Sequence, residues 1–141
     1  MSKRLLFDTN VLIDLTISSR PQHDVAVLAF SATVQGRHRA YALASSLKDV
    51  YYICHRHYGS ESLARTIVTR LRSAFELIDL TDTLVDKALE SDEVDFEDGL
   101  VRAAAEYVGC NAIVSRDKGA YENSSCARLD PIEVEGFLRP E

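Results

Sequence analysis

The stretch DFEDGLVRAAAEYVGCNAIVSRD, residues 95–117, decides the fold that this sequence predicts. Its apolar residues recur at helical spacing and give one helix face: Val101, Ala104, Ala105 and Val108. Gly109 follows them, at a position where a left-handed residue commonly ends a helix. Residues 112–114, AIV, then predict a short buried strand. The unit therefore places Asp98 in the first turn of a helix and Asp117 at the carboxyl end of a strand.

The N-terminus repeats this arrangement of strand, acid and helix. Residues 4–7, RLLF, form a compact and mostly apolar run that ends at Asp8. Thr9 and Asn10 follow, and the apolar residues 11–13, VLI, begin a helix. Ligand sites in open α/β sheets form at the carboxyl ends of the strands. We therefore ask whether Asp8 meets the two acids of the first unit, because carboxylates gathered at such an edge indicate a metal site.

Helices and strands alternate through the remaining chain. Apolar runs at 40–44 and 75–80 predict two more strands, and a short edge strand with a Pro-started turn of helix is expected at 128–134. One helix is predicted from the apolar stripe of Val25, Leu28, Ala29 and Ala32. Three polar residues stand where helix caps are expected: Ser46, Ser60 and Thr81. The alternation predicts an α/β fold with helices on both faces of a parallel sheet of four or five strands, as a single domain of residues 1–141.

Composition and charge are those of a water-soluble protein. The chain has 141 residues, of which 46% are hydrophobic and 27% charged, and we find no apolar run of the roughly 20 residues that a membrane helix needs. Three cysteines without a CxxC pair favour a reducing cytoplasm. The net charge of -6 divides into +5 for residues 1–72 and -11 for residues 73–141. The negative net charge of the whole chain therefore does not exclude that one face of the protein binds a nucleic acid.

Clustered acids without Cys or His ligands are suited to a hard cation. Mg²⁺ and Mn²⁺ prefer carboxylate and water oxygens. Such an ion assists phosphodiester hydrolysis because it activates a water and neutralises the phosphate. Carboxylates that lie together without a cation repel one another and destabilise the fold. A cluster of acids that persists despite this cost therefore indicates a functional site.

Four blocks of the sequence together resemble the PIN domain family, and the resemblance covers nearly the whole chain: LLFDTNVLIDL, SSLKDVYYI, residues 95–117 and DPIEVEGFL. Many members of this family are VapC-like toxin ribonucleases of VapBC-type toxin–antitoxin systems. The resemblance implies a three-layer α/β/α domain and four acids that hold the metal and catalyse, here Asp8, Asp49, Asp98 and Asp117. It also implies supporting roles for the polar pair Thr9-Asn10 and for the hydroxyl of Ser115. The second acid is more often Glu in the family, so Asp49 is expected to reach the metal directly or through a water.

The function that the resemblance implies is that of a cytoplasmic Mg²⁺- or Mn²⁺-dependent endoribonuclease. A metal-activated water would cleave RNA to leave 5′-phosphate and 3′-hydroxyl ends. The protein would form a homodimer, with no membrane attachment, and a cognate antitoxin would cover the acidic pocket. Two alternatives stay open, namely a free-standing RNA-processing nuclease and a non-catalytic interaction module with the same fold.

Further residues have competing interpretations. Asp95 is expected either to cap the helix that follows or to add charge beside Asp98. The cluster Cys54-His55-Arg56-His57 matches no common zinc spacing. A haloacid-dehalogenase-like phosphatase needs a second Asp where this sequence has Asn10, which argues against that class of enzyme. A receiver domain would require an acidic pair at the end of the first strand, but Asp8 is followed by Thr9 and Asn10. Several basic residues are candidates for contacts to an RNA backbone: Arg37, His38, Arg39, Lys48, Arg56, Arg65, Arg70 and Arg72.

Overall fold

The computed structural model describes residues 2–140 and contains one sheet with helices around it. In chain order the elements are β1 (Arg4–Phe7), α1 (Thr9–Thr16), α2 (His23–Gln35), β2 (Arg39–Leu43), α3 (Ser46–Tyr58), α4 (Glu61–Ala74), β3 (Glu76–Ile78), α5 (Asp82–Glu90), α6 (Phe96–Val108), β4 (Ala112–Val114), β5 (Ala127–Leu129), the 3₁₀ helix η1 (Pro131–Glu133) and α7 (Val134–Leu138). No helix within the described residues is long and apolar enough to cross a membrane.

The sheet has five strands in the order β3-β2-β1-β4-β5, and every neighbouring pair is parallel. The central strand is β1, where Leu5 pairs with Ala40 of β2 on one side and with Ala112 of β4 on the other. Because the strands are parallel, all their carboxyl ends lie at one edge of the sheet. The predicted parallel sheet of four to five strands is confirmed with five.

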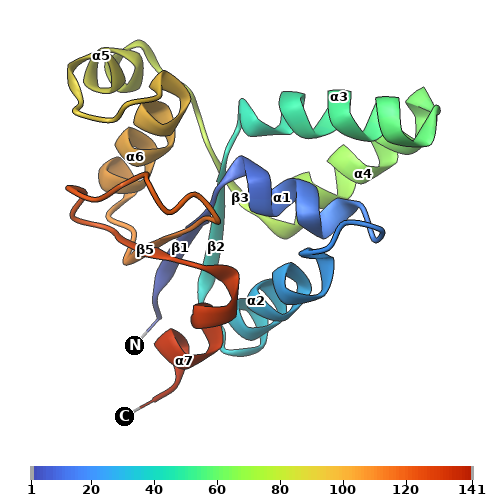
Figure 1. Cartoon of the computed structure of the whole chain (residues 1–141), viewed down its shortest axis with the longest axis horizontal. Coiled ribbons are helices and arrows are strands. Elements are labelled where there is room, and N and C mark those ends of the chain that lie inside the picture. Colours follow the sequence, from blue (N-terminus) through green and yellow to red (C-terminus); the bar gives the residue numbers. More distant parts are fainter. Residues whose placement is uncertain (1, 141) are drawn as a thin grey trace.

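Helices cover both faces of the sheet, so the fold has three layers (Figure 1). Alternate residues of β1 point to opposite faces, because successive side chains of a strand alternate in direction. Leu5 and Phe7 pack in the core beneath α1 to α4, whereas Leu6 packs in the core beneath α5 and α6. The expected three-layer α/β/α architecture is confirmed, and each helix that carries a candidate acid is held against this sheet.

Most of the predicted helix boundaries are confirmed. The side chains of Ser60 and Thr81 accept hydrogen bonds from the backbone three residues ahead, and each begins a helix. Asp95 caps α6 by accepting from the backbone N–H groups of Glu97 and Asp98. Gly109 ends α6 with a φ of 78°, a left-handed conformation that glycine adopts without a steric penalty.

Two local predictions were wrong. Ser46 does not cap α3, since the cap position is Ser45 and the buried Ser46 hydroxyl instead accepts a hydrogen bond from Thr9. The buried face of α2 consists of Ala26, Ala29 and Thr33, whereas Leu28 of the predicted stripe is 57% exposed. Small residues face inward because α2 packs closely against α1, η1 and α7, and the larger side chain is left at the surface.

Candidate functional site

The four candidate acids lie around the carboxyl edge of the sheet. Asp8 directly follows β1 and is the N-cap of α1, and Asp117 stands three residues after the end of the neighbouring strand β4. Asp98 lies in the first turn of α6 and Asp49 in the first turn of α3. A cavity of about 190 Å³ between α3 and α6 is lined by Asp8, Asp49 and Asp98 together with Thr9 and Lys48. The structure thus brings together acids that are up to 109 residues apart in sequence.

Asp8 is the most completely hydrogen-bonded acid of the group. It is 5% exposed, and its Oδ1 accepts a hydrogen bond of 2.7 Å from the backbone N–H of Thr9. Its Oδ2 accepts two hydroxyl donors, Ser115 at 2.8 Å and Tyr121 at 2.7 Å. These bonds fix both the position and the rotation of the carboxylate.

The predicted supporting residues hold the loops that carry the acids. The Ser115 hydroxyl, besides donating to Asp8, accepts from the backbone N–H of Asp117 at 3.1 Å and from the amide of Asn10 at 3.3 Å. Asn10 also accepts from the backbone N–H of Arg116 at 3.3 Å. Thr9 donates its hydroxyl to Ser46 at 2.7 Å and so ties the start of α1 to α3. Asp95, whose role was left open, acts as the cap of α6 described above.

The acids raise one another's proton affinity. Burial and the negative charges of Asp8, Asp117 and Asp95 raise the pKa of Asp98 from 3.8 to about 7. Burial raises the pKa of Asp8 as well, although the hydrogen bonds from Tyr121, Ser115 and Thr9 act in the opposite direction. Neighbouring carboxylates that repel in this way bind a proton or a cation more strongly than isolated ones. The negative charge of the site therefore favours the binding of a cation.

The acids do not form a closed ligand cage. Within residues 2–140, no three His, Cys, Asp or Glu side chains converge at distances that would hold a metal ion. Asp49 lines the cavity but makes no hydrogen bond to the other three acids in this part of the chain. A cation at this edge would consequently use some of the acids directly and others through water, as Mg²⁺ usually does.

The sequence interpretation missed Tyr121. Its hydroxyl lies between two acids, 2.7 Å from Asp8 Oδ2 and 3.3 Å from Asp98 Oδ1. Burial and the charge of Asp8 raise the pKa of this phenol, which therefore stays protonated and donates to Asp8. No helical or strand periodicity marks residue 121, because it belongs to the loop between β4 and β5.

A second missed feature is a buried acid with two arginines beside the site. Asp14 of α1 is 1% exposed and pairs with Arg116 at 2.6 Å and with Arg20 at 2.8 Å. Both arginine side chains are about one third exposed. One positive charge therefore remains in excess next to Asp117.

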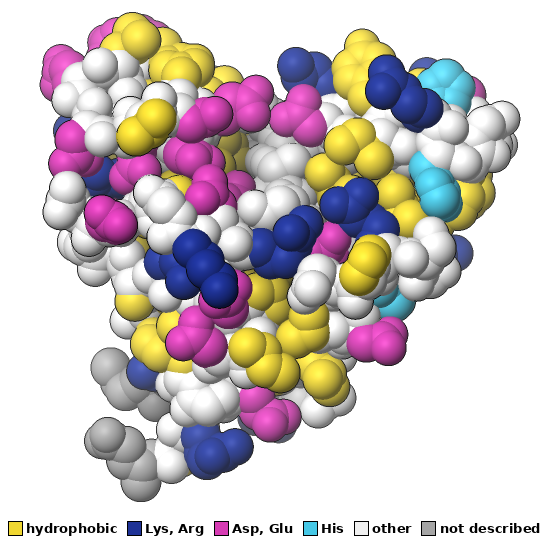
Figure 2. Space-filling model, in the orientation of Figure 1, with side chains coloured by type: hydrophobic (Ala, Val, Ile, Leu, Met, Phe, Trp, Pro, Cys, Tyr) yellow, Lys and Arg dark blue, Asp and Glu magenta, His cyan; other side chains and the backbone are white. Residues whose placement is uncertain are grey.

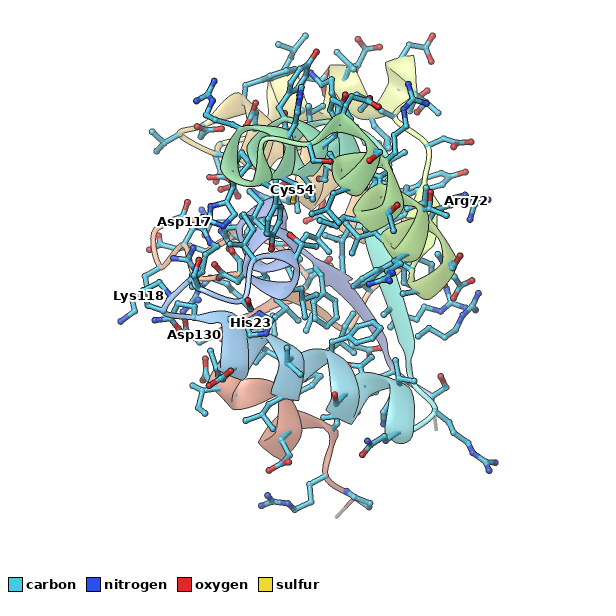
Figure 3. The ribbon with its side chains drawn as sticks, turned by 90° about the vertical axis from the view of Figure 1, so that its right-hand side faces the viewer. His23, Cys54, Arg72, Asp117, Lys118 and Asp130 are labelled. Atoms are coloured by element: carbon cyan, nitrogen blue, oxygen red, sulfur yellow. The ribbon has the colours of Figure 1, made fainter. Side chains whose placement is uncertain are left out.

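The predicted basic residues are spread over different parts of the molecule. Lys48 lines the acidic cavity, whereas Arg37, His38 and Arg39 stand at the start of β2, at the opposite end of the strands. Arg72 of α4 lies on the far side of the molecule from Asp117 (Figure 3). Figure 2 shows acidic side chains gathered over α5 and α6, while Lys and Arg side chains lie over the centre and over α3. Acidic and basic side chains therefore lie over different elements on this face.

Comparison with known proteins identifies the family. The fold and the group of acids define an α/β protein with a carboxylate site at the end of its parallel strands. The PIN domain family profile matches residues 4–119, and the chain belongs to this family. No curated protein matches the sequence.

Three solved structures of similar fold come from toxin–antitoxin systems. VapC20 of Mycobacterium tuberculosis, a toxin that cleaves the sarcin-ricin loop, has a TM-score of 0.68 and 18% identity, with 85% of this chain and 98% of that chain covered. A toxin–antitoxin complex from Klebsiella pneumoniae has a TM-score of 0.66 and 21% identity, covering 90% and 97%. VapBC2 of Rickettsia felis, bound to a promoter DNA fragment, has a TM-score of 0.65 and 11% identity, covering 89% and 97%. The fold is therefore that of VapC toxins.

Proposed function

We propose that this protein is a metal-dependent endoribonuclease and the toxin of a type II toxin–antitoxin pair. The main support for the proposal is that Asp8, Asp98 and Asp117 lie together at the carboxyl edge of a PIN-domain sheet. Asp49 lies across the cavity from them. The toxin–antitoxin neighbours support the biological setting.

The donor set fits Mg²⁺ or Mn²⁺. All four acids offer carboxylate oxygens, which hard divalent cations prefer, and no cysteine or histidine lines the cavity. The raised pKa values of Asp8 and Asp98 reflect burial and repulsion that a divalent cation would relieve. Asp8, Asp98 and Asp117 would hold the ion, and Asp49 would contact it directly or through a water.

A bound ion would supply an activated water and would neutralise the charge of the phosphate. The chain's own residues supply the positioning. The hydrogen bonds of Thr9, Ser115 and Tyr121 hold Asp8 in one orientation. Lys48 at the cavity and Arg116 beside Asp117 are placed to contact the RNA backbone, which carries one negative charge per phosphate. Cleavage would leave 5′-phosphate and 3′-hydroxyl ends.

A cognate antitoxin would cover the site and silence it. Large apolar side chains are exposed on α2, α3 and α4, among them Leu28, Tyr52, Ile53 and Leu63. An antitoxin segment with an apolar stripe would pack on these helices, and its Arg or Lys side chain would take the cation's place among the acids. We include a homodimer and a cytoplasmic location in the proposal, as the family resemblance implies.

The nuclease proposal is tested by incubating the purified protein with RNA in EDTA, in Mg²⁺ and in Mn²⁺, and by mapping the ends of the products. Cleavage should require the ion and should disappear in Asp117→Asn. The exposed Asp86 of α5 offers a matched control, Asp86→Asn, which removes the same charge away from the site and should cleave as the wild type does. Metal-independent cleavage, or full activity of Asp117→Asn, would contradict the proposal.

The partner proposal is tested by purifying the protein together with the product of the adjacent gene. A small protein should bind, reduce cleavage, and lose affinity for Tyr52→Asp, whose side chain is 61% exposed on α3. Light scattering of the separate protein should give the mass of a dimer. A protein that is active alone and has no such partner would instead be a free-standing RNA-processing nuclease, and a stable partner without any cleavage activity would favour an interaction module.

A further inference from the structure

Tyr121 has a backbone conformation that is unusual for its residue type. Its φ is 67°, in the left-handed region, where a residue with a Cβ is sterically strained. The side chain is 2% exposed and has the largest volume among the fully buried side chains. A loop tolerates such a conformation only where its surroundings enforce it.

The surroundings of Tyr121 are an ion-pair network between two loops. The backbone N–H of Tyr121 donates to Glu93 Oε1 at 3.0 Å, and Glu93 Oε2 pairs with Arg102 of α6 at 3.0 Å. Arg102 also donates to the backbone carbonyl of Asn123 at 3.0 Å. Both sides of residue 121 are thereby anchored to α6, the helix that carries Asp98. The phenol is directed from this anchored loop into the acidic site.

The hydroxyl of Tyr121 determines which oxygen of Asp8 is free. Each carboxylate oxygen has two acceptor positions. Asp8 Oδ2 uses both for the hydroxyls of Ser115 and Tyr121. Asp8 Oδ1 uses one for the backbone N–H of Thr9. A single acceptor position on Oδ1 therefore remains for a cation.

We propose that Tyr121 is a positioning residue that leaves Oδ1 as the oxygen of Asp8 that would be available to a metal ion. This inference rests on the proposed metal-dependent function. The hydroxyl occupies the second position on Oδ2, prevents the carboxylate from rotating, and lies between the carboxylates of Asp8 and Asp98. Groups that hydrogen-bond to metal ligands in this way commonly contribute about 10- to 100-fold to metal affinity.

The test is the affinity of the full-length protein for Mn²⁺, measured by calorimetry without RNA. Tyr121→Phe removes one oxygen atom and should weaken Mn²⁺ binding about 10- to 100-fold. Tyr107→Phe is the matched control, because Tyr107 lies on α6 and is 73% exposed; its affinity should equal that of the wild type. Thermal unfolding in EDTA is followed in parallel, since a merely structural role of Tyr121 would lower the melting temperature without changing the Kd for Mn²⁺.

The possible results separate this inference from the proposed function. Equal Kd values for the wild type and Tyr121→Phe would overturn the positioning role and leave the nuclease proposal intact. A wild-type protein that binds no Mn²⁺ would overturn both. If Tyr121→Phe does not fold, Ser115→Ala provides a second test, because it removes the other hydroxyl donor to Asp8 Oδ2. It should show a similar loss of affinity, and an unchanged Kd would overturn the assignment of acceptor positions.

Discussion

Asp98→Asn should make the metal-free protein more stable at alkaline pH. Burial and three neighbouring acids raise the pKa of Asp98 from 3.8 to about 7. Between these two pH values the folded state binds a proton that the unfolded state has released. Stability therefore falls as pH rises from about 4 to about 7, and the full penalty is present above that range.

The size of this penalty follows from the shift. The pKa values of Asp98 in the unfolded and folded states differ by about 3, which corresponds to about 4 kcal/mol in the free energy of unfolding. Asp98 is only partly buried, and solvent screening reduces the expected gain for Asp98→Asn to about 1–2 kcal/mol. The asparagine carries no charge, so it removes the repulsion and retains the size of the side chain.

Urea unfolding in EDTA measures this gain at about pH 8 and at about pH 4. The free energy of unfolding of Asp98→Asn should exceed that of the wild type at the higher pH, and the difference should vanish at the lower one. Added Mg²⁺ should stabilise the wild type more than the variant. Asp86→Asn on α5 controls for the loss of a surface charge and should change the free energy by less than about 0.5 kcal/mol. Equal or lower stability of Asp98→Asn at about pH 8 would refute the argument that the acids repel one another.

Three further predictions concern single side chains. Asp49→Ala should lower the RNA cleavage rate, whereas Asp49→Glu should retain most of it because the family commonly has Glu at this position; equal loss in both would mean that the cavity requires the shorter acid. Asp14→Asn should lower the free energy of unfolding by about 2 kcal/mol, because two partly exposed arginines lose their buried partner, and urea unfolding with an unchanged midpoint would contradict this. Gly109→Ala should cost about 1 kcal/mol by the same measurement, since its φ is 78° but open space surrounds the added Cβ.

The layered fold could be predicted from local patterns in the sequence. The stretch 95–117 has a cap, a periodic apolar face, a terminal glycine and a buried strand, and each feature lies where the structure has it. The positions of Asp8 and Asp117 followed as well, because a parallel sheet brings the carboxyl ends of β1 and β4 to one edge. These features are predictable because they depend on residues close together in sequence and on one topological rule.

The contacts that complete the site depend on residues far apart in sequence. Tyr121 reaches Asp8 across 113 positions, and its backbone N–H donates to Glu93, 28 positions away. Asp14 pairs with Arg116 across 102 positions. The exposure of Leu28 likewise follows from how closely α2 packs against its neighbours and cannot be inferred from its own spacing. Sequence periodicity contains no signal for such partners.

Crystals grown with Mn²⁺ and measured for anomalous scattering would test most directly whether the acids of this PIN domain hold a divalent cation. A peak at the carboxyl edge of the sheet is expected among Asp8, Asp98, Asp117 and Asp49, with some of these acids in direct contact and the others in contact through water. The peak should be absent in Asp98→Asn crystals prepared in the same way. An anomalous peak elsewhere in the wild type, or none despite Mn²⁺ in the crystals, would contradict the account.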